Sequence, residues 1–535
     1  MYMKKFTRLL PAAFMLALAL PTYAAKTLVF CSEGSPSSFN PSLGADSTTF
    51  DATSATVYEQ LTEFKPGTTD IEPALAQSWE ISEDGKTYTF HLRPHVKFHS
   101  NKQFQPTREL NADDVIFSFM RQQDRQHPFY GISKIGYPLY HTYFEAGEEN
   151  LIASIDRLDD LTIRFTLNSP RASFLSLLTL PLTSIYSAEY AEKMQAAGKP
   201  EQIDLIPIGT GPFQFINYNK DAQIQYKTFA AYWREKPGID RLVFSITPDA
   251  SIRYAKLRKN ECQVMAFPNL AELDEIKKNP QVKLLEKPSL NVGYLAFNVE
   301  KAPFDNLKVR QALSMAINKP DILAAIYQGH AVNATTLIPP ALWSHNAGIK
   351  DAPYDIDRAK ALLAEAGYAG GLSVELWAMP IQRPYNPNAR RMAEMIQSDW
   401  EKLGVKTTVV SYEWGEYLAR SGRGEHQAML YGGTNIMGDP DNTFSALASC
   451  AAVKSGTNRA RWCDKDFDRL ILKAGQVSAR SERSKLYEQA QEIMHQQIPF
   501  LPIAHSIIYE AIGDNVAGYS VDPLGLHRFN HVVLK

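Results

Sequence analysis

Hydrophobic and polar positions alternate in patterns that predict strands and helices along the chain, most clearly between residues 371 and 412. Residues 373–379 are mostly apolar and rich in strand-forming types, and residues 405–412 repeat this pattern with valine and threonine. Between them, apolar side chains recur at helical spacing over residues 389–403, and Gly404 provides a stop signal. The stretch therefore predicts a β–α–β unit, and ligands of such open sheets collect beyond the carboxyl ends of the strands.

The loop of this unit carries the first candidate for chemistry. Three prolines interrupt the pattern over residues 380–388, and Asn386 followed by Pro387 predicts the start of the helix. Arg383 lies between turn-forming residues in the same loop. A guanidinium on a stiff loop can hold a carboxylate with two parallel hydrogen bonds. From the loop alone, the alternative of a surface salt bridge is the favoured interpretation of Arg383.

The same patterns predict elements over the rest of the chain. A helix that follows residues 46–50 is expected to carry an apolar face formed by Val57, Leu61 and Phe64. A loop near Arg383 is expected over residues 432–442. Strands are predicted at residues 26–31, in a hairpin over 78–92, and at 161–167, 213–226, 241–246, 262–267, 290–297, 428–431 and 503–507. Helices are predicted after Asn111 and at residues 251–259, 309–316, 319–327, 416–420, 466–474 and 484–497.

Length and charge narrow the class of protein. With 535 residues the chain is too long for one hydrophobic core, and its length predicts roughly three or four domain-sized pieces. The formal net charge of −2 gives no indication of a nucleic acid or an anionic membrane as a partner. The hydrophobic fraction of 44% is that of an ordinary soluble protein, so the chain should form conventional packed domains.

The first 25 residues have the features of a signal peptide. Lys4 and Lys5 make a basic start, residues 9–20 are apolar but too few to span a bilayer, and small residues precede Ala25. No cysteine follows directly, so we expect no lipid anchor. No later segment has the length and apolarity of a membrane helix. We therefore expect an exported protein that is free in the periplasm.

Cysteine usage agrees with an oxidising compartment. The chain contains Cys31, Cys262, Cys450 and Cys463, and four cysteines allow three disulfide pairings. The shortest separation favours Cys450 with Cys463, which leaves Cys31 for Cys262. No C-x-x-C spacing occurs and histidines are scattered, so we expect neither a metal site nor a cofactor.

Several short motifs resemble those of the bacterial extracellular solute-binding proteins of family 5, the peptide and nickel transport class. The resemblance covers essentially the whole mature chain, and within the family it is greatest to the dipeptide-binding members. The motifs that carry it are Ala76-Gln-Ser-Trp79, Phe90-His-Leu-Arg93, Asn111-Ala-Asp-Asp-Val-Ile-Phe117, Gly209-Thr-Gly-Pro-Phe213, Val309-Arg-Gln-Ala312, Asp439-Pro440, Cys31-Ser-Glu-Gly-Ser-Pro36, Val521-Asp-Pro-Leu-Gly525 and the run from Trp377 to Ile396.

This resemblance implies a two-lobed α/β periplasmic binding protein, type II-like and of cluster C, with a ligand enclosed between the lobes by hinge closure. A smaller β-rich subdomain is attached to the first lobe. The family also implies disulfides Cys31–Cys262 and Cys450–Cys463, as the separations do. The expected organisation is a signal peptide (1–25), lobe I (26–60, 209–288 and 508–535), its subdomain (61–208) and lobe II (289–507).

The resemblance also implies a set of ligand-binding residues. It assigns the carboxylate-binding role to Arg383, which reverses the preference for a salt bridge. It places Ser47, Thr48 and Thr49 where family members offer backbone to an extended peptide, as in strand addition. The complete expected set is Arg383, Tyr385, Asn386, Ser47, Thr48, Thr49, Gly433, Asn435, Ile436 and Asp439.

One departure from the dipeptide-binding members concerns the ligand's amino end. The family's aspartate for the peptide α-ammonium falls at Ile436, and its pocket tryptophan falls at Gly433. An ammonium enclosed beside isoleucine has no carboxylate to offset its lost hydration. Free dipeptides should therefore bind poorly, and a larger or N-blocked ligand should be preferred. The alternative is that Asp439 or Asp441 moves in to replace the missing charge.

The expected function is that of a monomeric substrate-binding component of an ABC importer. It would capture a peptide or a peptide-like anion and deliver it to an inner-membrane permease and its ATPase, with no nucleic acid involved. Haem or another non-peptide solute is the alternative on the same scaffold, with Tyr385 as a possible axial group. A secreted peptidase is disfavoured because the sequence has no H-E-x-x-H, G-x-S-x-G or P-loop motif.

Overall fold

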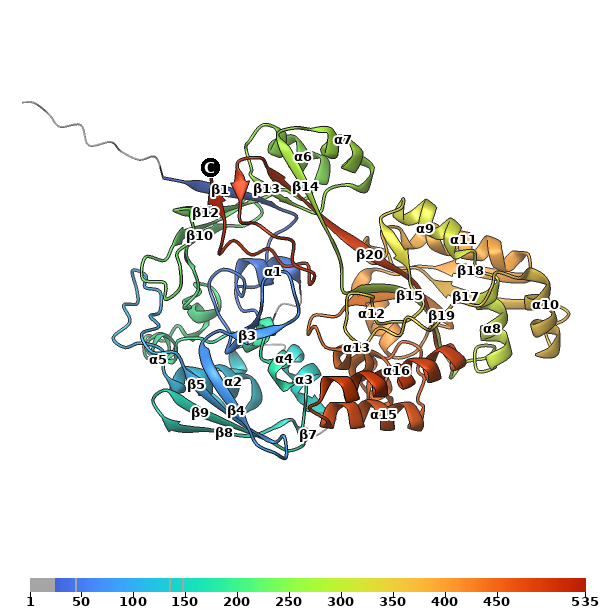
Figure 1. Ribbon diagram of the computed structural model, residues 1–535, viewed down its shortest axis with the longest axis horizontal. Helices are drawn as coiled ribbons and strands as arrows, with labels where there is room; N and C mark the ends of the chain where they lie inside the picture. Colours follow the sequence, from blue (N-terminus) through green and yellow to red (C-terminus); the bar gives the residue numbers. More distant parts are fainter. Residues whose placement is uncertain (1–24, 44–45, 134–135, 147–148) are drawn as a thin grey trace, which may run out of the picture.

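The computed structural model describes residues 25–43, 46–133, 136–146 and 149–535, so the predicted signal peptide lies almost entirely outside the described residues. Two lobes lie side by side and are connected by long strands (Figure 1). Both contain a mixed sheet with helices packed on it. The predicted two-lobed α/β fold is confirmed. Within the described part of the chain, no helix combines the length and the apolarity needed to cross a membrane.

Lobe I is built on a sheet in which β1 runs parallel to β12 and β13, while β10, β11 and β12 pair antiparallel. Alternate residues of β1 and its neighbours are buried, and Leu28 and Phe30 are fully enclosed. The strands are β10 (Phe213–Asn219), β11 (Gln223–Thr228), β12 (Arg241–Ile246), β1 (Thr27–Ser32) and β13 (Val264–Ala266). The helices of this lobe include α1 (Ser47–Ala52), α6 (Ala250–Arg258) and α7 (Leu273–Lys278).

The subdomain has its own four-stranded antiparallel sheet and its own hydrophobic core. Its helix α2 (Ala112–Gln123) begins at Asn111, and the side chains of Asn111 and Asp114 form a reciprocal capping box. The sheet order is β4 (Ala76–Ile81), β5 (Thr87–Leu92), β9 (Thr162–Leu167) and β8 (Ile152–Asp159). Smaller elements are β2 (Thr62–Phe64), β3 (Ile71–Pro73), α3 (Pro138–Phe144), β6 (Glu145–Ala146), β7 (Glu149–Asn150), α4 (Phe174–Leu177) and α5 (Ala188–Ala196).

Lobe II contains the predicted β–α–β unit, because β17 (Leu372–Trp377) runs parallel to β18 (Val405–Val410) and α11 (Ala389–Glu401) connects them. The apolar stripe of α11, with Met392, Ile396 and Trp400, is fully buried. The remaining elements are β15 (Asn291–Phe297), α8 (Leu307–Met315), α9 (Lys319–Tyr327), β16 (Ala331–Asn333), α10 (Ile356–Glu365), α12 (Trp414–Gly422), β19 (Ala428–Thr434), α13 (Pro440–Leu447), α14 (Cys450–Ser455), α15 (Lys465–Gln476) and α16 (Arg480–Gln497).

One strand connects the two lobes and is much longer than predicted. The sequence predicts a strand at residues 503–507, whereas β20 spans Phe500–Gly513. Its first part pairs with β15 in lobe II, and its second part pairs with β13 and with β14 (Val282–Pro288) in lobe I. Nearly all its residues are buried, which explains why periodicity alone could not define its ends. The chain ends with the short strands β21 (Val516–Ala517) and β22 (Val533–Leu534).

Residues 53–64 do not form the helix predicted to follow residues 46–50, and a short helix, α1, lies before them instead. The Asp46 side chain caps α1, but the helix ends before Thr53, and Phe64 lies in β2 instead. The hydroxyls of Thr53 and Ser54 donate to carbonyls one turn earlier, so these residues favour the end of the helix over its extension. The apolar positions identified there are nevertheless buried, in loop and strand rather than on a helix face.

Two further local predictions are also wrong, one at residue 386 and one at residues 432–434. The cap of α11 is Asn388, whose side chain accepts a hydrogen bond from the Arg391 amide, and not Asn386. The backbone of Asn386 is instead bonded to that of Arg383 in a tight turn. The segment 432–434, expected in a loop, extends β19 because it pairs with β15.

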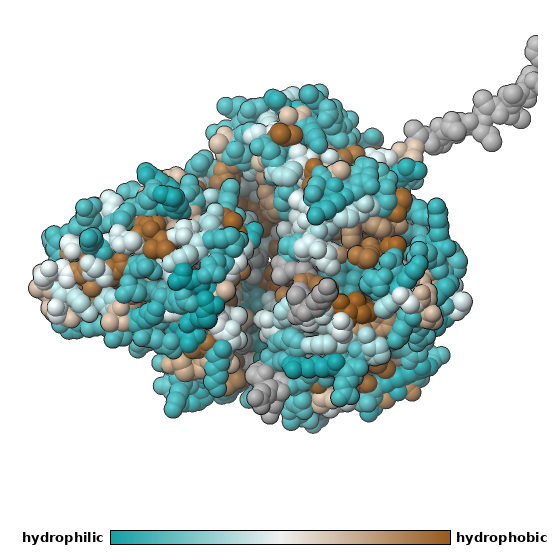
Figure 2. All heavy atoms as spheres, turned by 180° about the vertical axis from the view of Figure 1, so that it is seen from behind, coloured by the Kyte–Doolittle hydropathy of each residue, from teal (hydrophilic) through white to brown (hydrophobic). Residues whose placement is uncertain are grey.

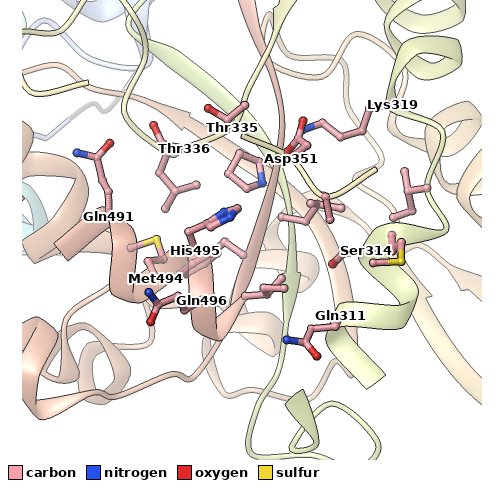
Figure 3. A pocket seen from close by; sticks show the side chains of 18 of the residues that line it. Gln311, Ser314, Lys319, Thr335, Thr336, Asp351, Gln491, Met494, His495 and Gln496 are labelled. Carbon is pink, nitrogen blue, oxygen red and sulfur yellow. The ribbon is translucent and has the colours of Figure 1, made fainter. Parts of the chain in front are cut away.

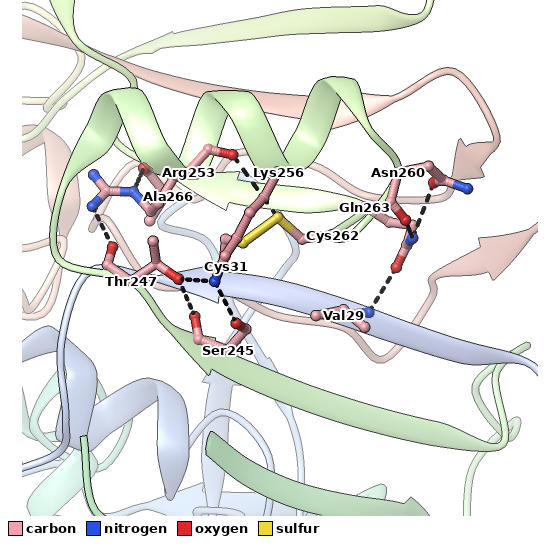
Figure 4. The surroundings of a disulfide bond; sticks show 10 residues. All are labelled: Val29, Cys31, Ser245, Thr247, Arg253, Lys256, Asn260, Cys262, Gln263 and Ala266. Atoms are coloured by element: carbon pink, nitrogen blue, oxygen red, sulfur yellow. Dashed lines mark hydrogen bonds between the residues drawn. A yellow bond between two sulfur atoms is a disulfide. The ribbon is translucent and has the colours of Figure 1, made fainter. Parts of the chain in front are cut away.

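Both predicted disulfides are present. Cys31 of β1 is bonded to Cys262, which lies just before β13, with their Cα atoms 5.9 Å apart. Figure 4 shows this bond between α6 and β1, beside the hydrogen bond that the Val29 amide of β1 donates to the Gln263 side chain. Cys450 is bonded to Cys463 near α13, with Cα atoms 4.5 Å apart. Each disulfide therefore lies within one lobe.

Candidate functional site

Arg383 stands in the loop beyond the carboxyl end of β17, as predicted for a ligand edge. Its side chain is exposed, and its guanidinium carbon lies 5.5 Å from the centre of the Trp414 ring. Neighbouring Arg390 and Arg391 are paired with Glu394. Within the described residues, no carboxylate lies at ion-pair distance from Arg383. The guanidinium is thus held by a tight turn and an aromatic ring without a counter-charge.

Tyr385 anchors this loop to the sheet. Its carbonyl accepts a hydrogen bond from the Tyr327 hydroxyl at 2.7 Å, and its ring packs directly on β19. A β-carbon at Gly293 or Gly432 would collide with the backbone or ring of Tyr385, so both positions require glycine. Burial raises the pKa of the Tyr385 phenol, although the adjacent Arg383 guanidinium acts in the opposite direction.

A small cavity lies beside β19, where the subdomain meets lobe II. It has a volume of about 170 Å³, and none of its lining side chains is charged. Gly433 opens into free space, since a β-carbon there would meet no atom within 4 Å. The lining residues are Thr142, Tyr143, Leu290, Val292, Leu337, Gly433, Thr434, Asn435, Asn442, Thr443, Ala446, Leu447 and Thr457. On the face of the molecule that Figure 2 shows, a cleft runs between the two lobes.

Ile436 and Asn435 follow directly after β19. Ile436 is half-buried and packs on the hydrophobic core of the subdomain, together with the buried Met437. The Asn435 amide group donates to the Asp439 carbonyl and to the Thr443 hydroxyl, so it holds the shape of this turn. Ile436 stands where the family's aspartate for the ligand's ammonium falls. It therefore lies at the contact between the subdomain and lobe II.

Asp439 and Asp441 already have partners. Both oxygens of Asp439 are bonded to the Arg483 guanidinium, at 2.7 and 2.8 Å, and the pair is buried. Asp441 is 1% exposed and is paired with Arg171 of the subdomain at 2.7 Å. The alternative in which either carboxylate replaces the missing ammonium partner is therefore not supported. A ligand contact of the Asp439 carboxylate stays a prediction, and it would require breaking a buried ion pair, which is costly.

Ser47, Thr48 and Thr49 do not offer an extended edge. They form the first turn of α1, and their hydroxyls are bonded within lobe I. Strand addition requires extended backbone with outward-pointing amides and carbonyls, which a helical turn does not provide. The helical turn at these three residues does not favour a β-like backbone contact, and their contact with a ligand stays a prediction.

A larger cavity than the one beside β19 lies elsewhere in the molecule. It has a volume of about 510 Å³ and is enclosed within lobe II between α8, α16 and β20 (Figure 3). The cation of Lys319 at its wall is paired with Asp351 at 2.7 Å. None of the sequence-predicted site residues lines this cavity. Its size therefore does not make it the candidate site.

Comparison with known proteins gives the family. Residues 70–455 match the model of "Bacterial extracellular solute-binding proteins, family 5 Middle". This chain belongs to that family. It is 55% identical to the dipeptide-binding protein of Escherichia coli (strain K12), with 96% of this chain and 95% of the relative covered. It is 49% identical to heme-binding protein A of Haemophilus influenzae, with 94% of this chain and 91% of the relative covered.

A solved structure agrees with the fold of this family 5 protein. The dipeptide-binding protein from Pseudoalteromonas sp. SM9913, in complex with Met-Leu, is similar with a TM-score of 0.84. The two chains are 39% identical, and 95% of this chain and 100% of the other are covered. Family membership places this chain among binding proteins. The names of these relatives indicate two ligand classes, dipeptides and haem. The ligand class of this chain must therefore be argued from the site itself.

Sequence reasoning missed three aromatic residues at the candidate site. Trp414, which lies beside Arg383, stacks on Tyr431 at 6.2 Å between ring centres, and Tyr143 of the subdomain lines the small cavity together with Asn442. A cluster of aromatic residues at 412–417 was a usable signal for Trp414. No sequence pattern connects Tyr143 with the loop after β19, because they come from different lobes.

Proposed function

We propose that this protein is the periplasmic substrate-binding component of an ABC importer and captures a peptide or peptide-like anion between its lobes. The observation that carries the proposal is the Arg383 guanidinium, which is fixed by its loop and has no carboxylate partner in the described structure. A peptide carboxylate matches its two parallel donors. The dipeptide-binding relatives support this ligand class. The captured ligand would be delivered by a monomer to a permease and its ATPase.

The small cavity supports a peptide over haem. A cavity of about 170 Å³ accommodates a single side chain, whereas drug-sized ligands occupy about 300–1,000 Å³. Its uncharged lining suits an apolar or neutral side chain. Tyr385 is a poor axial group, because its ring is buried against β19 and burial raises the pKa of its phenol. These observations favour a peptide over the haem that the relative's name indicates.

The amino end of the ligand defines the expected selectivity. Ile436 supplies no charge, and Asp439 and Asp441 are bonded to arginines. A free α-ammonium at this position would lose its hydration without compensation. We therefore expect N-blocked or longer peptides to be preferred over free dipeptides, with their carboxylate at Arg383.

Calorimetry with N-acetyl-Ala-Leu tests the role of Arg383. Arg383→Ala should weaken binding about 30-fold or more, since truncating one partner of an enclosed charge pair costs about 2–5 kcal/mol. Arg383→Lys should also bind more weakly, because an ammonium does not match the two oxygens of a carboxylate. Arg390→Ala is the matched control, because Arg390 is exposed on α11 and paired within its own helix. Equal affinity of the Arg383→Ala and Arg390→Ala variants would contradict the proposal.

A further inference from the structure

The subdomain and lobe II touch each other far from the strands that connect the lobes. The chain passes between the lobes at residues 288–291 and along β20. In Figure 1, α3 and α4 of the subdomain lie beside α15 and α16 of lobe II, at the opposite end of the molecule from α6 and α7. The Ala172 amide donates to the Gly475 carbonyl of α15 at 2.6 Å. These contacts join two parts that no chain connection holds together at this point.

Asp441 is the centre of this contact. It lies in the first turn of α13 in lobe II and is 1% exposed. One of its oxygens accepts from the Ser173 hydroxyl at 2.5 Å and lies 2.7 Å from a nitrogen of Arg171. Arg171 and Ser173 belong to the subdomain, and the Tyr88 hydroxyl holds their loop through the Arg171 carbonyl. The lobe II carboxylate is thus enclosed by partners from the other side of the cleft.

The energetics of this group depend on whether the lobes are closed. If the lobes separated, the Asp441 carboxylate would regain its hydration and would lose its contacts with Arg171 and Ser173. In the closed arrangement its burial is costly, and the charge of Arg171 and the hydroxyl of Ser173 offset that cost. Burial raises the pKa of Asp441, but Arg171 and Ser173, together with Ser445 and Arg483 of lobe II, outweigh burial and lower that pKa. By contrast, Asp439 is bonded to Arg483 of its own lobe, so it keeps its partner whether the lobes are open or closed.

We propose that Asp441, Arg171 and Ser173 form a latch that stabilises the closed arrangement of the lobes. The inference rests on the proposed function only for its effect on ligand binding, since closure itself can be measured without a ligand. Asp441 directly precedes Asn442, which lines the small cavity, so the latch joins the lobes beside that cavity. Weakening it should favour the open state and shorten the lifetime of a bound ligand.

Energy transfer between two fluorophores can report closure directly. All four native cysteines are in disulfides, so Leu158→Cys on β8 and Leu472→Cys on α15 would add two labelling sites. These leucines are 45% and 62% exposed and lie on the subdomain and lobe II. Arg171→Ala should lower the closed population, both free and with N-acetyl-Ala-Leu. It should weaken binding of that peptide roughly tenfold or more, because an unpaired carboxylate remains buried on closure.

A double-mutant cycle separates a latch from a general loss of stability. Asp441→Asn removes the charge together with its need for a partner, so Arg171→Ala should have less effect in its presence. Arg157→Ala is the control, since Arg157 is also in the subdomain but pairs with Asp113 there. Unchanged distance distributions in Arg171→Ala, or additive effects of the two substitutions, would overturn the latch. If the peptide fails to bind the wild type, the proposed function fails, and the distances in the free protein still decide the latch.

Discussion

Arg383 and Ile436 impose opposite requirements on the two ends of a ligand. Arg383 has an exposed guanidinium without a carboxylate partner in the described residues, whereas Ile436 offers an apolar surface. An anionic end gains a charged hydrogen-bond partner, and a cationic end loses water without replacement. Selectivity at this site is therefore expected to arise as much from the missing charge at residue 436 as from the positive charge at residue 383.

Restoring an acidic residue at position 436 should change this selectivity. Ile436→Asp should improve the binding of free Ala-Leu about tenfold or more relative to N-acetyl-Ala-Leu, because the α-ammonium gains a partner. The gain should be greatest at low salt. Ile436→Asn is the control of similar shape without charge. Calorimetry with both peptides measures the ratio, and micromolar binding of free Ala-Leu by the wild type would already contradict the prediction.

A second group of charged residues, away from the ligand site, should make stability depend on pH. His527 Nδ1 is 2.7 Å from Asp51, and its Nε2 is 3.7 Å from Glu510. Burial alone would lower the pKa of His527, but these carboxylates outweigh it and raise the pKa to about 10. Burial has the opposite effect on a carboxylic acid, and it raises the pKa of Glu510 to about 7. Glu33 is the further carboxylate that acts on His527.

The sign of this dependence follows from the direction of the His527 shift. A histidine whose pKa is higher in the folded state stabilises the protein fully below its unfolded value, near 6.5, and this contribution is lost as pH rises through about 10. Melting temperature should therefore fall between about pH 7 and 10, and His527→Gln should flatten that decline. His531→Gln is the exposed control. Parallel curves for wild type and His527→Gln would show that His527 is not the cause.

At the scale of elements, β20 and the two disulfides hold distant parts of the chain together. β20 pairs with strands of both lobes, so it forms part of both sheets. Beside it, the Asn291 side chain exchanges two hydrogen bonds with Ser506, at 2.7 and 3.0 Å. These bonds lie at the point where the chain crosses between the lobes. The connection is therefore built from ordered backbone rather than from a loose linker.

The disulfides should differ in their effect on stability. Cys31–Cys262 spans 231 positions and Cys450–Cys463 spans 13. On the chain-entropy argument, these cross-links contribute about 5 and about 3 kcal/mol, because the longer closed loop restricts the unfolded chain more. Replacing both cysteines of the first pair by alanine should lower the melting temperature more than the same change in the second pair. Calorimetric scans of the two double variants compare them, and equal or reversed shifts would contradict the ranking.

At the scale of the whole molecule, the proposed function requires the lobes to move. In the described arrangement the two lobes touch, because Asp441, Ile436 and Met437 of lobe II all contact the subdomain. A ligand that bridges Arg383 and the small cavity should favour this arrangement over an open one. The equilibrium between open and closed forms then couples ligand capture to the shape that a permease would meet.

Small-angle scattering should detect this movement. Adding saturating N-acetyl-Ala-Leu to the mature protein should reduce its radius of gyration, since closing brings the lobes together. The Arg383→Ala variant at the same peptide concentration should show less of the change, and Arg390→Ala should show all of it. A radius that does not respond to bound peptide in the wild type would contradict ligand-dependent closure.

The sequence by itself determined those features that depend on neighbouring residues or on short spacings. The apolar stripe of α11 and the flanking strands β17 and β18 could be predicted, because helical and strand periodicities are local. The same holds for the cap at Asn111 and for the short disulfide. Where two local signals competed, the prediction failed, since either Asn386 or Asn388 could cap α11 and only the turn at Arg383 decided between them.

Only the tertiary structure decided which distant groups meet. Ser173 and Asp441 are 268 positions apart, and nothing near either residue indicates that they are bonded. The same applies to the burial of Asp439 by Arg483 and to the packing of Tyr385 on Gly432. A charge or a glycine in the sequence does not specify its partner, because burial and pairing depend on how whole lobes pack. That no carboxylate among the described residues pairs with Arg383 is therefore a property of the fold as much as of the residue.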